Sequence, residues 1–60
     1  MKIYVVSDGY DVLGVFESVD SAKLMCDIHG YDRIDEYELN KPNPIRCWLH
    51  SYDVWEEFGL

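Results

Sequence analysis

Residues 33–39, Arg-Ile-Asp-Glu-Tyr-Glu-Leu, decide the fold of this chain. They combine strand-forming residues with a dense row of carboxylates, and they follow a predicted helix. The stretch therefore predicts a strand over about 32–39 whose acids point at solvent. The alternation is irregular, because Ile34 falls on the same face as Glu36. Either a bulge near Asp35 or a cover over the second face of the strand is expected.

The residues before this stretch predict a hairpin and a helix. Residues 3–6 are β-branched or aromatic and predict a first strand, and residues 12–16 predict a second strand after a glycine-containing turn. Apolar residues then recur at helical spacing over 19–29. Ser18 is a typical N-cap residue, and Gly30 is a typical residue just past a helix C-terminus.

The order of these elements predicts an α+β fold with a ββαβ core. Its three-stranded antiparallel sheet would carry one helix on a face, with the first strand in the centre and the acidic strand at an edge. The chain is expected to be one small domain, residues 1–60, with its core in 1–39. Two prolines make 40–44 an extended connection. Residues 45–60 then form an aromatic tail, with a short helix expected at 52–58.

Composition limits the partners. Twelve acidic residues against five basic ones give a net charge of −7. This charge repels nucleic acid and anionic membranes, so neither is expected as a direct partner, and it attracts a protein with a basic surface. Two cysteines do not make a secreted disulfide framework. The apolar run near the N-terminus has the length of a strand rather than of a signal peptide. A cytoplasmic location is expected.

Four short segments occur here in a recognisable order: Ile3-Tyr4-Val5-Val6, Gly14-Val15-Phe16, Ser21-Ala22-Lys23 leading to Cys26-Asp27-Ile28-His29-Gly30, and Arg33 to Leu39. Together they resemble a group of small uncharacterised proteins common in bacteriophages and their bacterial hosts. The resemblance covers residues 2–39 and leaves 40–60 without support. It implies a ββαβ core and a phage or prophage accessory protein in the host cytoplasm. It implies no activity, cofactor or catalytic residue.

The cysteines and histidines form one suggestive pattern. Cys26-x2-His29 and Cys47-x2-His50 use every Cys and His in the chain, and a Cys2His2 zinc site would stabilise so short a protein. Structural zinc sites usually pair two cysteines in a knuckle, and a free cysteine on an apolar stripe is normally a small buried hydrophobe. We therefore expect no metal, no cofactor and no enzyme activity, with a zinc-stabilised module as an alternative.

The carboxylates and the tail aromatics are the expected partner-binding groups. An acidic strand can imitate phosphates for a nucleic-acid enzyme, although such runs are more often solvated strand faces. Exposed Trp residues dominate binding hot spots, although a small core also needs them. The expected function is binding and modulation of a host protein, with a self-associating structural protein, for example a homodimer, as the other alternative. The expected partner-binding residues are Asp32, Asp35, Glu36, Glu38, Trp48 and Trp55.

Overall fold

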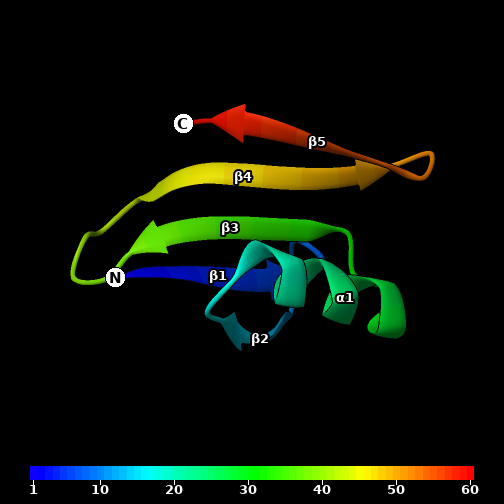
Figure 1. Ribbon diagram of the computed structural model, residues 1–60, viewed down its shortest axis with the longest axis horizontal. Helices are drawn as coiled ribbons and strands as arrows, with labels where there is room; N and C mark the ends of the chain where they lie inside the picture. Colours follow the sequence, from blue (N-terminus) through cyan, green and yellow to red (C-terminus); the bar gives the residue numbers. More distant parts are fainter.

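The computed structural model describes all 60 residues as one five-stranded antiparallel sheet with one helix. The sheet order is β2-β1-β3-β4-β5 (Figure 1). The elements in chain order are β1 (Lys2–Ser7), β2 (Val12–Phe16), α1 (Val19–His29), β3 (Arg33–Glu38), β4 (Pro44–Ser51) and β5 (Val54–Gly59). The helix is too short and too polar to cross a membrane.

The first hairpin and the helix form where the sequence predicts them. β1 and β2 form the expected hairpin, and β3 pairs with β1. The Ser18 hydroxyl accepts a hydrogen bond from the Ser21 amide at the start of α1. Gly30 takes a left-handed conformation, with φ of 76°, and its amide donates to the Cys26 carbonyl. These caps satisfy backbone groups that a helix leaves open at its ends.

The prediction of a three-stranded core with a helical tail is wrong. Residues 44–59 form a β-hairpin that adds two strands to the sheet beside β3. As a result the acidic strand lies in the middle of the sheet rather than at its edge. Tyr52 and Asp53 make the two-residue turn, both with positive φ. This geometry suits a two-residue β-hairpin.

The spacing that indicated a helix at 52–58 fits a strand equally well. Val54 and Phe58 are four residues apart, and four is also an even number of residues. The two side chains therefore share a face in a helix and in a strand alike. The strong sequence signal for this hairpin turn is Asn-Gly or Asp-Gly, whereas this chain has Tyr-Asp. No local feature of the sequence therefore distinguishes a helix from a strand in the tail.

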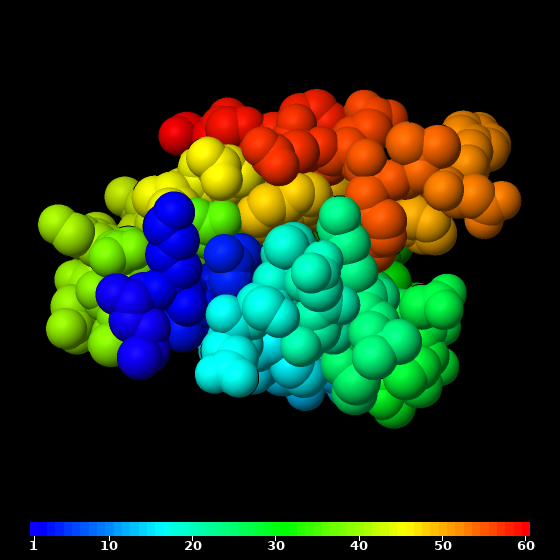
Figure 2. All heavy atoms as spheres, in the orientation of Figure 1, coloured from blue at the N-terminus to red at the C-terminus, as the bar shows by residue number.

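The core lies between α1 and one face of the sheet. It consists of the buried residues Val6, Ala22, Cys26, Ile34 and Trp48. The helix packs on β1, β2 and β3. In the space-filling view, the atoms of β5 lie beside those of the helix (Figure 2). Trp48 of β4 reaches back into the core and lies 5.8 Å from Tyr4, ring centre to ring centre. One large ring therefore joins the hairpin to the rest of the molecule.

The irregular pattern of β3 has a specific cause. Ile34 does face the helix, and so does Glu36, because they are two residues apart in the same strand. The register does shift, but between Glu36 and Tyr37 on the β4 side. The opposite face carries one row across all five strands: Val15, Val5, Asp35, Cys47 and Phe58.

Candidate functional site

The carboxylates expected at an exposed edge are mostly buried or paired. Asp35 and Glu36 are buried on the central strand, Glu36 to 1% exposure. Asp35 accepts two hydrogen bonds from the guanidinium of Arg33, at 3.0 and 3.2 Å, and this contact raises the pKa of Arg33. Glu38 pairs with the N-terminal amine at 3.3 Å. Only Asp32 of the four is exposed. The expectation that this strand presents a solvated acidic strip is therefore wrong.

Glu36 is neutralised from the two neighbouring strands. Lys2 Nζ of β1 lies 3.5 Å from one carboxylate oxygen, and Arg46 Nη1 of β4 lies 3.6 Å from the other. The oxygen facing Lys2 has no hydrogen bond. The lysine and arginine side chains remain about half exposed, so they bring charge to a buried acid while staying in contact with water. Glu36 therefore has a structural role, because it links β3 to the strands on both sides through ion pairs.

The two tryptophans have different positions. Trp48 is buried, and its indole nitrogen donates to Glu57 Oε1 at 3.2 Å. Trp55 is half-buried, and its ring centre lies 4.9 Å from the ring centre of His50. The ammonium of Lys23, on α1, lies 5.8 Å from the centre of the Trp55 ring. Trp55 is therefore the tryptophan that a ligand can reach.

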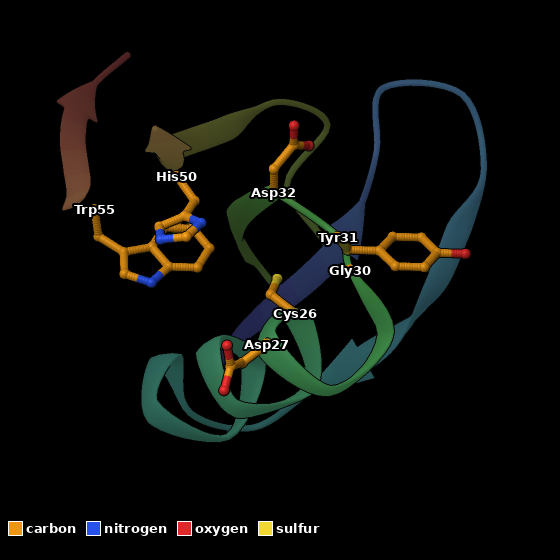
Figure 3. A pocket seen from close by; sticks show the side chains of 7 residues that line it. All are labelled: Cys26, Asp27, Gly30, Tyr31, Asp32, His50 and Trp55. Carbon is orange, nitrogen blue, oxygen red and sulfur yellow. The ribbon is translucent and has the colours of Figure 1, made fainter. Parts of the chain in front are cut away.

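A pocket of about 260 Å³ lies where the C-terminal end of α1 meets the β4–β5 hairpin. The His50–Trp55 pair forms one wall, and the last turn of the helix forms the other (Figure 3). A backbone hydrogen bond from the His50 amide to the Asp32 carbonyl, 3.0 Å, holds the two walls together. The lining residues are Cys26, Asp27, Gly30, Tyr31, Asp32, His50 and Trp55.

Cys26 is poorly suited to nucleophilic chemistry in this pocket. Burial raises the pKa of its thiol to about 11, and the nearby carboxylate of Asp32 adds to the shift. Reactive cysteines need the opposite, a pKa lowered toward neutrality by positive charge. At neutral pH Cys26 is a protonated thiol that fills space in the core.

We expect this thiol to make the protein sensitive to alkali. Its pKa is about 11 in the folded state against 9.0 for a free thiol, so the thiolate forms first in the unfolded chain. The stabilisation is complete below pH 9 and is lost as the pH rises through 11, by on the order of 2 kcal/mol. Melting temperatures measured across this range should fall for wild type. They should fall less steeply for Cys26→Ala, and equal slopes would contradict the assignment.

The four candidate zinc ligands do not come together. Cys26 belongs to the core on the helix side of the sheet. Cys47 alternates with Trp48 along β4 and therefore faces the other side. No group of three or more Cys, His, Asp or Glu side chains is arranged to hold a metal ion. Both cysteines are free thiols.

The outer edge of β5 is a second candidate surface. The Leu60 amide donates to the Ile45 carbonyl, 3.2 Å, which fixes the alternation of bonded pairs between β4 and β5. The N–H and C=O groups of Trp55, Glu57 and Gly59 must therefore point away from β4. They form an unpaired strand edge. At the opposite edge of the sheet, where β2 is the outermost strand, a register shift between Val6 and Ser7 interrupts the pairing of β1 with β2.

The exposed carboxylates at the edge of the sheet lie on β5, whereas the sequence predicted them on the strand at 32–39. The exposed edge carries Glu56 and Glu57, which the helical reading of the tail left out of the candidate set. Their signal was present, since they adjoin Trp55 within a strand-length segment after a possible two-residue turn. Of the predicted partner-binding residues, Asp32 and Trp55 meet in the pocket.

Comparison with known proteins adds no relative: no family model, curated protein or solved structure matches this chain.

Proposed function

We propose that the protein is a non-enzymatic binding protein that takes up an extended, basic segment of a partner protein along the edge of β5. The observation that carries the proposal is the unpaired edge of β5 with two adjacent carboxylates at its middle, Glu56 and Glu57. An added strand gains main-chain hydrogen bonds from such an edge, and side chains on both strands supply specificity.

The charges of Glu56 and Glu57 determine which kind of strand can pair with the edge of β5. Glu56 has no ion-pair partner within the chain, whereas Glu57 lies 3.5 Å from Arg46. A second copy of the protein, paired antiparallel about the centre of β5, would place Glu57 opposite Glu57 of that copy, or Glu56 opposite Glu56. Like charges directly opposite one another destabilise a strand pair. A lysine- or arginine-containing strand would meet opposite charge instead, in keeping with the net charge of −7.

Apolar side chains on the same hairpin can supply the rest of the contact. Val54 and Phe58 are exposed on one face of β5, and Leu49 of β4 lies beside them. Burial of such side chains contributes about 25 cal/mol per Å² of apolar surface removed from water. An amphipathic basic strand would therefore satisfy the edge, the carboxylates and this apolar face together. We propose that the partner is a host protein and that this chain belongs to a phage or prophage.

The test is capture from host lysate by the immobilised protein, using variants that separate backbone pairing from charge. Gly59→Pro removes one outward N–H, and there is free space for a side chain at this position. Gly59→Ala keeps the N–H and is its control. Glu56→Lys reverses charge at the edge, and Glu17→Lys makes the same change at the exposed residue that follows β2.

We expect one partner to be retained by wild type, Gly59→Ala and Glu17→Lys and released by high salt. Gly59→Pro and Glu56→Lys should lose at least about tenfold in affinity, which corresponds to 1.4 kcal/mol. Equal retention by all variants would overturn the edge assignment. Self-association of wild type in light scattering, with no captured partner, would favour a structural protein instead.

A further inference from the structure

The pocket between α1 and the β4–β5 hairpin has the composition of a site for a cation with a flat face. We infer that it receives an arginine side chain of the bound segment, with the guanidinium against Trp55 and facing Asp27 and Asp32. This inference deepens the proposed function and rests on it, because it names the side chain that the partner strand would insert. The pocket itself can be tested without the partner.

The aromatic wall favours a cation. The half-buried ring of Trp55 already has an ammonium near it, that of Lys23 at 5.8 Å from the ring centre. The ring therefore faces positive charge within the protein itself, as expected for the electron-rich face of an indole. A guanidinium is planar and weakly hydrated, so it can stack on the His50–Trp55 pair in a way that an ammonium cannot.

The opposite wall is negative. Asp27 and Asp32 line the pocket, and both are exposed to solvent. Neither carboxylate makes an ion pair within the chain. The pocket also lies at the C-terminal end of α1, whose partial negative charge favours a cation. Two free carboxylates, a helix C-terminus and an aromatic wall thus surround a space of about 260 Å³.

The geometry of β5 connects this pocket to the proposed partner strand. Trp55 is one of the residues whose backbone groups point to the open edge, and its side chain lies on the helix side of the sheet. A residue directly opposite Trp55 on an added strand would have its side chain on that same face, within about 4.5–5.5 Å between Cβ atoms. That position leads a long side chain to the mouth of the pocket.

The probe is N-acetylarginine methylamide, titrated into 15N-labelled protein and followed at the indole N–H signal of Trp55. N-acetylcitrulline methylamide has nearly the same shape without the charge and is the matched control ligand. Nα-acetyllysine methylamide, which keeps its side-chain ammonium, separates the effect of charge from the effect of planarity. We expect saturable shifts centred on Trp55 and the end of α1, with a dissociation constant on the order of millimolar for arginine. Binding of lysine should be weaker by at least about threefold, and citrulline should give no saturable shift.

Substitutions in the protein test whether arginine binds in this pocket. The double change Asp27→Asn and Asp32→Asn, and separately Trp55→Leu, should weaken arginine binding at least about fivefold. Asp53→Asn, at the tip of the hairpin turn, removes an exposed charge outside the pocket and should have no effect. Equal shifts with citrulline, or shifts spread over all exposed acids, would overturn the arginine site. In that case capture of a partner that depends on Glu56 and Gly59 would still stand, so the two proposals fail separately.

Discussion

Glu36→Lys is expected to abolish folding. Glu36 is 1% exposed at the centre of the sheet, between Lys2 and Arg46. A lysine there would be a buried cation facing two others, which costs several kcal/mol. A core of this size rarely supplies more than about 3–5 kcal/mol in total. Far-UV circular dichroism and one-dimensional proton NMR of the purified variant should show an unfolded chain.

Two controls separate burial from charge. Glu36→Met replaces an acid that has one oxygen without a hydrogen bond, and it leaves Lys2 and Arg46 about half exposed to water. Its free energy of unfolding should stay within about 1 kcal/mol of wild type. Glu38→Lys breaks only a partly exposed pair with the N-terminal amine and should also cost about 1 kcal/mol or less. A folded Glu36→Lys variant of wild-type stability would contradict the central position of β3.

Trp48→Ala is expected to have a similarly large effect. Trp48 is 6% exposed and joins the hairpin to the core, so its removal leaves a cavity at that junction. Truncating a buried Trp to Ala costs about 3–5 kcal/mol, as much as the whole domain is expected to have. Urea unfolding, where the variant folds at all, should show a midpoint far below that of wild type.

The matched variants are Trp48→Phe and Trp55→Ala. Trp48→Phe keeps a ring beside Tyr4 but loses the hydrogen bond to Glu57, so it should cost about 1–2 kcal/mol. Trp55 is only half-buried, and its truncation should cost clearly less than that of Trp48. Equal destabilisation by Trp48→Ala and Trp55→Ala would contradict the different positions of the two rings.

The sequence predicted the elements whose signals are local. Ser18 and Gly30 carry their own capping chemistry, so the helix was predicted with its observed ends, Val19–His29. The β1–β2 hairpin likewise follows from strand-forming residues on either side of a glycine-containing turn. Each of these predictions depends on residues that are close to one another in the sequence.

Long-range pairing was outside the reach of local patterns. A row of acids favours solvent, yet Glu36 is buried, because the strands on both sides each bring a cation to it. Nothing in residues 33–39 indicates Arg46, which arrives from a segment whose spacing suits helix and strand alike. The misplacement of the tail also hid the candidate site. Its edge and the aromatic wall of its pocket both belong to the β4–β5 hairpin.

The central claim is that β3 lies between β1 and β4, and nuclear Overhauser contacts between Hα protons test it directly. Val6–Ile34 and Asp35–Cys47 are opposed residues outside the hydrogen-bonded pairs, where the two backbones approach most closely. The fold predicts strong Hα–Hα contacts for both pairs in the same sample. A Val6–Ile34 contact without the Asp35–Cys47 contact, together with helical contacts over 52–58, would contradict it.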